Sequence, residues 1–245
     1  MKRNGLGAGF ALVLLCVAVA SLLGAAVGLS GESALYGSFS RGAVEELFRR
    51  RGQETVTRED ITGAIGLDEQ SQEAVARELA AFMRGESETL PRVLGEKEVQ
   101  HLWDVRGLMR SLDRLSRGLV LVSGIGVLLL ALFRNSWKEA LRALCAGALG
   151  ALLILAAVAL FVALLGFDRS FVLMHRLLFD NELWAMDPGT QILIRIMPST
   201  LFERALQLTA ARALIRMLIM LALLTGVYVL VHKMTLRNLQ AGGKP

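Results

Sequence analysis

The chain has 245 residues, 54% of them apolar, and a mean hydropathy of +0.51. Soluble domains are roughly 45–50% apolar, and here the excess lies in long uncharged runs, so an ordinary soluble fold is excluded. The net charge of +5 does not indicate nucleic-acid binding, because no basic run exceeds Arg49-Arg50-Arg51 and no aromatic residues interleave with it.

Four apolar runs predict an all-α polytopic membrane protein with four transmembrane helices. A helix needs about 20 apolar residues to cross the hydrocarbon. The predicted spans are residues 6–29, 118–133, 143–167 and 205–232. We expect the first to stay uncleaved, because it is long for a secretory signal and no convincing cleavage site follows it. Cys16 and Cys145 fall inside spans, so no disulfide or metal site is indicated.

The basic residues predict the orientation of these spans. Lys2 and Arg3 precede the first span, and further Lys and Arg residues occupy the short loop 134–142 and the tail 233–245. Cytoplasmic loops carry an excess of Lys and Arg. Both termini are therefore predicted to be cytoplasmic, and segments 30–117 and 168–204 to face outward.

The outward segment 30–117 reads as a small helical extracytoplasmic domain. Apolar residues recur at helical spacing around Val44, and Thr57 with Asp60 forms a capping pattern at the start of a second helix. An amphipathic helix follows Ser71 and ends at Gly85. The next helix begins near Gly95 and continues into the second span.

Two histidines lie in the outward segments and are the candidates for chemistry. Nucleophile elbow, zinc-protease and P-loop signatures do not occur in the sequence, so an enzyme here would work without a protein nucleophile. His101 and His175 are either packed side chains or acid–base groups. For them to meet, the helix carrying His101 must lie down or bend, with Gly107 or Gly118 as the expected place. His232, at the end of the last span, is expected to be structural.

A metal centre is not expected. It would need at least three protein ligands, which His101, Asp104 and His175 would have to supply, and no ligand-spaced repeat supports this. The arginine pairs at the outer ends of the second and fourth spans, including Arg212 and Arg216, either snorkel or form a cationic lining. No cofactor is predicted.

Two separated elements resemble the lipoprotein intramolecular transacylase (Lit) family of bacterial membrane proteins. Residues 98–106 (EVQHLWDVR) are similar to its E-x-x-H-[LM]-x-D-V-[KR] element. The stretch 168–202 resembles its second element, F-x-x-x-H-x-x-F-F…W-x-[FL]-D-P…P-x-x-F-F. The residues that match in order are Phe171, His175, Phe179, Trp184, Asp187, Pro188, Pro198 and Phe202. Gln191 and Ser199 depart from residues common in the family.

The resemblance implies a reaction that needs no enzyme nucleophile. The family moves the sn-2 acyl chain of a diacylglyceryl-modified lipoprotein to the amino group of its N-terminal cysteine, giving a lyso-form lipoprotein. His101 and His175 would then be the acid–base pair, in an active site facing outward from a bacterial cytoplasmic membrane. The partners would be the lipoprotein and membrane lipids. The alternative is a non-enzymatic lipid-binding or membrane-assembly protein of the same topology.

The expected supporting residues come from the same two elements and from the fourth span. Asp104 would orient His101 or stabilise its charge. Arg106, or the pair Arg212 and Arg216, would steady the oxyanion of the tetrahedral intermediate. Phe171, Trp184 and Asp187 complete the site that the resemblance implies.

Overall fold

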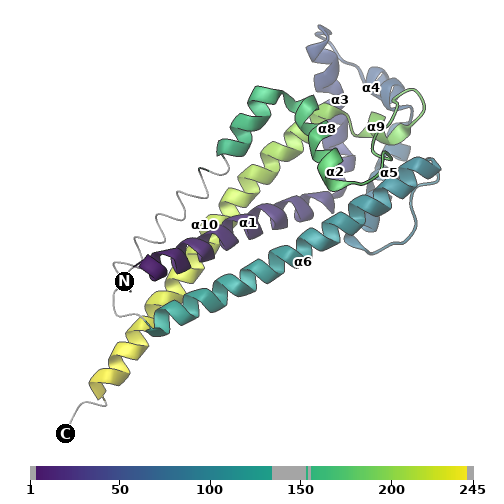
Figure 1. Cartoon of the computed structure of the whole chain (residues 1–245). Helices are drawn as coiled ribbons and strands as arrows, with labels where there is room; N and C mark the ends of the chain where they lie inside the picture. The colour runs from purple at the N-terminus through teal and green to yellow at the C-terminus, as the bar shows by residue number, and fades with distance from the viewer. Residues whose placement is uncertain (1–3, 134–152, 154–155, 242–245) are drawn as a thin grey trace. The chain divides into compact units, whose positions relative to one another are not determined.

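The protein is all-helical over the residues that its structure, a computed structural model, describes: 4–133, 153 and 156–241 (Figure 1). This confirms the predicted helical class. The chain divides into two compact units, one of residues 1–25, 112–160 and 210–245, the other of residues 26–111 and 161–209. The predicted loop 134–142, Cys145 and most of the predicted third span lie outside the described residues.

The first unit is built from parts of three long helices, α1 (Asn4–Ser30), α6 (Glu96–Phe133) and α10 (Ser199–Ala241). Val17 of α1 and Met217 of α10 are buried together. The Ser116 hydroxyl donates to the carbonyl of Ala20 at 2.9 Å, which joins α6 to α1. In a membrane such side-chain bonds hold helices together where the hydrophobic effect does not.

One helix among the described residues, Ser199–Val231, is long and apolar enough to cross a membrane by itself. Two bent pairs pass the same test together: 15–30 with 33–50, bent by 64°, and 156–165 with 167–178, bent by 112°. If each bent pair is one span, the described residues contain three spans.

The second unit packs short helices around one apolar core. It contains α2 (Ser33–Tyr36), α3 (Ser38–Arg50), α4 (Arg58–Ile65), α5 (Glu69–Arg84), α8 (Phe167–Leu178) and α9 (Ile192–Ile196), with the start of α6 and of α10. Helix α2 packs on α3 and α5, and α9 packs on α3 and α4. Leu79 and Phe82 of α5 are fully buried in the core, and each such side chain contributes about 1.5–3 kcal/mol.

Local sequence signals fix the start of α4 and the end of α5 as predicted, whereas α5 starts at Glu69, before the predicted Ser71. Thr57 and Asp60 form the complete capping box of α4. Helix α5 ends at Gly85, whose φ of +82° lies in the left-handed region that favours glycine. Its N-cap is Asp68, three residues before Ser71, and the Asp68 carboxylate accepts the Ser71 N–H at 2.8 Å.

The bend predicted at Gly107 or Gly118 is absent, because α6 runs through both glycines without a break (Figure 1). The sharp turn lies instead at Gly166. This residue has φ +78° and ψ 152°, and there the chain turns by 112° between the helix of residues 156–165 and α8. Only glycine adopts this backbone region without strain, so Gly166 sets the direction of the helix that carries His175.

Candidate active site

His101 and His175 face each other inside the second unit. His101 lies near the start of α6 and His175 near the end of α8, and their ring centroids are 6.0 Å apart. Both are buried, with 8% and 6% of their surface exposed. The predicted meeting of the two histidines is therefore present, and the turn at Gly166 takes the place of a bend in α6.

Aromatic rings surround the pair. The ring of Phe171, one turn before His175, lies 4.1 Å from its imidazole, and that of Trp184 lies 5.2 Å from it. Phe179 stacks on His175 at 5.7 Å and meets His101 edge-on at 5.2 Å. Such an environment excludes water and disfavours charge on either imidazole.

The protonation state of His175 follows from its hydrogen bond. Its Nδ1 lies 2.8 Å from the carbonyl oxygen of Phe171. A carbonyl only accepts, so Nδ1 carries the proton and Nε2 carries the lone pair of the neutral ring. Burial lowers the pKa of His175, and the bond to Phe171 offsets part of that effect. Its basic nitrogen is therefore available at neutral pH.

His101 is more strongly perturbed. Burial, and then the nearby charge of His175, lower the pKa of His101 to about 4, although Asp104 acts in the opposite direction. Its Nδ1 is buried and has no hydrogen-bond partner within the described residues. An unsatisfied buried nitrogen costs about 1–3 kcal/mol, which marks it as a position where a bound polar group would be stabilised.

The Asp104 carboxylate is held by a residue that sequence reasoning missed. Asn181, in the loop after α8, donates from Nδ2 to Asp104 Oδ2 at 2.9 Å. Its Oδ1 accepts the Leu183 N–H at 3.0 Å, and its carbonyl accepts the Trp184 indole N–H at 2.9 Å. Asn181 thereby ties the loop and the Trp184 ring to α6, next to the histidines.

Glu98 fixes the start of α6 from a buried position. One carboxylate oxygen accepts the Gly95 N–H and the other the Leu193 N–H, both at 2.6 Å. With only 2% of its surface exposed, it bridges the beginning of α6 to the beginning of α9. Glu98 stands one turn before His101 in the first motif. The spacing of that motif does not indicate that Glu98 bonds the backbone of Leu193, 95 residues further along the chain.

The Arg106 guanidinium has other partners than an oxyanion. It is fully buried, donates to both oxygens of Glu88 at 3.1 and 2.9 Å, and lies over the rings of Phe82 and Trp103 at 4.5 and 5.1 Å. It also donates to the Ser87 carbonyl. These contacts anchor the loop after α5 to α6 and favour a structural role.

Asp187 shapes a turn. Its carboxylate accepts the Gly189 N–H at 2.9 Å, and its own N–H donates to the Gln191 side-chain oxygen at 2.5 Å. Gln191, a departure from the family pattern, therefore still supplies an acceptor for the Asp187-Pro188 turn. Asp187 is exposed, and the contacts that it makes are those of a loop-forming residue.

Arg212 and Arg216 belong to the first unit. The Arg216 guanidinium lies against α1 at Gly24, where an added Cβ would come within 2.6 Å of its nitrogen, and near the Ser116 hydroxyl. Glycine at this position makes room for the arginine.

No group of three or more His, Cys, Asp or Glu side chains that would hold a metal ion occurs among the described residues.

The fold and the site define an all-helical protein in which two buried, uncharged histidines meet inside a cage of aromatic rings. The family model described as lipoprotein intramolecular transacylase Lit matches residues 52–202, more than half of the chain. The chain belongs to this family and is a lipoprotein intramolecular transacylase, an acyltransferase. The predicted family and enzyme class are thereby confirmed, and the non-enzymatic alternative is set aside.

Solved structures of one bacterial protein share the fold. The membrane integral lipoprotein intramolecular transacylase Lit from Bacillus cereus matches with a TM-score of 0.60 at 20% identity, over 91% of this chain and 96% of that chain. Two variants of it with one histidine replaced match with TM-scores of 0.59 and 0.60, at 20% and 19% identity. They cover 97% and 96% of this chain, and 100% and 99% of their own.

None of the curated proteins compared with the sequence matches it. The membrane-integral matches and the apolar helix Ser199–Val231 together support a membrane location.

Proposed function

We propose that this transacylase moves the sn-2 acyl chain of a diacylglyceryl-modified lipoprotein to the α-amino group of its N-terminal cysteine, with His101 and His175 as the acid–base pair. The observation that carries the proposal is their approach to 6.0 Å within an aromatic cage. Two imidazoles this close can serve both ends of one proton transfer between bound substrate groups.

The proposed step is balanced within the substrate. The amine nitrogen attacks the ester carbonyl carbon and the new C–N bond forms. The bond between that carbonyl carbon and the sn-2 glyceryl oxygen then breaks. One proton leaves the amine nitrogen and one reaches the departing glyceryl oxygen, so neither water nor an enzyme nucleophile enters the equation. The histidines relay this proton, and the Nε2 lone pair of His175 supplies one end of the relay.

The other site residues have supporting roles in this proposal. The Asp104 carboxylate counters positive charge on His101 during the relay, and its effect on the pKa of His101 supports this. Phe171 and Trp184 exclude water, and Asp187 forms the turn that follows Trp184. Arg106 is left out of these roles, because its guanidinium is already paired with Glu88.

The proposed topology retains four spans, with both termini in the cytoplasm and segments 30–117 and 168–204 outside. The placement of Lys and Arg supports it. So does the turn at Gly166: a bend of 112° directs α8 back rather than onward through the bilayer. Single cysteines at Arg92 and Arg237 test it, because only the first would be labelled by an impermeant reagent on intact cells.

Mass spectrometry of lipoprotein N-terminal peptides tests the reaction. The full chain, incubated with diacylated lipoprotein, is expected to yield an N-acyl, S-monoacylglyceryl peptide. His101→Ala and His175→Ala should each lower the rate at least 100-fold, the usual range of acid–base catalysis. His232→Ala is the matched control and should remain active. Normal conversion by His101→Ala or by His175→Ala would contradict the assignment of that histidine to acid–base catalysis.

A further inference from the structure

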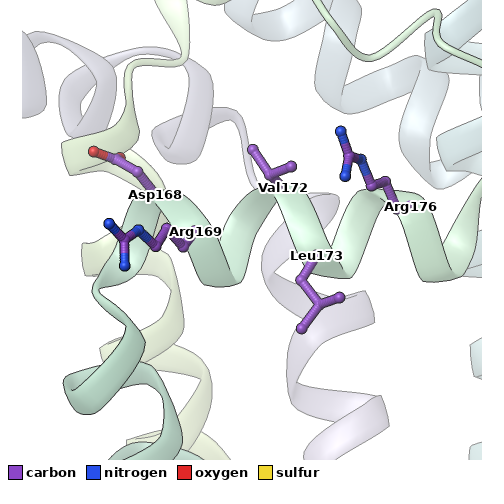
Figure 2. Close-up of a pocket in the computed structure, with 5 residues that line it drawn as sticks. All are labelled: Asp168, Arg169, Val172, Leu173 and Arg176. Carbon is purple, nitrogen blue, oxygen red and sulfur yellow. The ribbon is translucent and has the colours of Figure 1, made fainter.

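An exposed face of α8 carries a shallow surface pocket of about 340 Å³ that is not part of the histidine site. It is lined by Asp168, Arg169, Val172, Leu173 and Arg176 (Figure 2). In Figure 2 the two arginines stand at the two ends of the group, with the apolar pair between them. These positions share one face of the helix, and the buried His175 lies about 100–120° around the helix axis from both arginines.

Both arginines lack a counterion among the residues that the structure describes. Within the part of the chain that the structure describes, neither guanidinium has a hydrogen-bond or ion-pair partner, and both side chains are exposed. They are seven positions apart in the sequence, which places them about 10 Å apart along the helix axis. The face therefore presents two positive charges against the single negative charge of Asp168, and it complements anions.

The adjoining face of α8 is apolar and exposed. Leu173, Met174 and Leu177 are 41%, 42% and 76% exposed. Only Gly166 separates α8 from the helix of residues 156–165, whose Leu160 and Leu164 are 59% and 78% exposed. Apolar side chains on one face of a short helix with arginines at their border are typical of a helix lying in the membrane interface.

We propose that α8 is an interfacial helix whose Arg169 and Arg176 bind the phosphate groups of anionic phospholipids, while its leucines enter the acyl region beneath them. The occupant is a phosphatidylglycerol-type lipid, because the face is cationic at both ends and apolar between. Binding there holds His175, about a third of a turn around the same helix from the two arginines, at the level of the lipid ester bonds. Lipid binding itself does not depend on the proposed reaction, whereas this consequence does.

Native mass spectrometry of the detergent-solubilised full chain tests the binding. Wild type should retain dioleoyl-phosphatidylglycerol in preference to dioleoyl-phosphatidylcholine. Arg169→Gln/Arg176→Gln should weaken retention by about fivefold per arginine, about 25-fold for both. The matched control, Arg58→Gln/Arg92→Gln, removes two exposed charges elsewhere in the unit and should behave as wild type. Circular dichroism of both double variants shows whether α8 has unfolded.

Three outcomes overturn the proposal. One is equal retention of the two lipids by wild type, and another is unchanged retention by the α8 variant while it stays folded. The third is full displacement of the lipid by millimolar inorganic phosphate, which would show a free-anion site instead of a lipid site.

Turnover in nanodiscs tests the consequence. Raising phosphatidylglycerol from zero to 30% in phosphatidylcholine should speed conversion by wild type and not by Arg169→Gln/Arg176→Gln. If wild type binds the lipid selectively but converts no lipoprotein in any nanodisc, the reaction assignment fails and the lipid site stands. If it converts lipoprotein equally at both compositions, the proposed role of the lipid in catalysis fails.

Discussion

Acidification should destabilise the protein through His101. Burial holds the pKa of His101 at about 4, whereas an unperturbed histidine titrates near about 6.5. Between these values the unfolded chain binds a proton that the folded protein excludes, so the stability present above the unfolded pKa is lost as pH falls towards the folded one. Integrating between the two values gives a loss of about 2.5 kcal/mol at pH 4.5 relative to pH 7.5.

Thermal unfolding in detergent, followed by tryptophan fluorescence, measures this loss. For a chain of this size, about 2.5 kcal/mol corresponds to a fall in Tm of about 5–10 °C between the two pH values. His101→Gln removes the titrating group and should shrink the fall by that amount, whereas His232→Gln should leave it unchanged. If His101→Gln loses as much Tm on acidification as wild type, His101 is not excluded from protonation and the reasoning is refuted.

Three further substitutions probe how the site is positioned. Gly166→Ala should cost about 1–3 kcal/mol and most of the activity, because alanine is strained at φ +78°, whereas Gly118→Ala in the continuous α6 should leave Tm and rate intact. Asn181→Ala releases the Asp104 carboxylate, whose charge raises the pKa of His101, so that pKa should fall in an NMR titration of the His101 imidazole, whereas a purely structural loss would leave it unchanged. Glu98→Gln keeps one acceptor oxygen and loses a charge-assisted bond, so Tm should fall by several degrees and the Ala variant by more.

The parts of the fold that sequence predicted are those encoded locally. The capping box of Thr57 and Asp60 needs only four neighbouring residues, and the left-handed end at Gly85 needs only a glycine after an apolar stripe. The histidine pair was predicted from two motifs that agree in order. Each of these signals is readable because the interacting groups lie close in sequence or recur in a known pattern.

The parts that sequence missed depend on distant partners. The sequence alone does not distinguish Gly166 from Gly118. Only the backbone shows that Gly166 has a positive φ while Gly118 is helical. Glu98 bonds a backbone group of residue 193, and Asn181 bonds Asp104 across 77 positions. No period or spacing encodes such contacts, so the positioning groups of the site emerge only once the helices are placed.

The low pKa of His101 constrains how the proposed relay works. An α-amino group titrates near about 8, about four units above His101, so complete proton transfer from the ammonium to this imidazole would be uphill by about 5 kcal/mol. The amine must therefore arrive neutral, and its N–H becomes acidic only as the C–N bond forms.

The same low pKa makes the His101 imidazolium a strong acid towards the departing glyceryl oxygen. Burial thus favours acceptance of the amine proton by the Nε2 of His175, transfer of that proton to His101, and its donation from there to the glyceryl oxygen. In this mechanism the rate rises with pH up to about 8, following the substrate amine. A rate that stays level from pH 6 to pH 8 would show that the enzyme removes the ammonium proton itself.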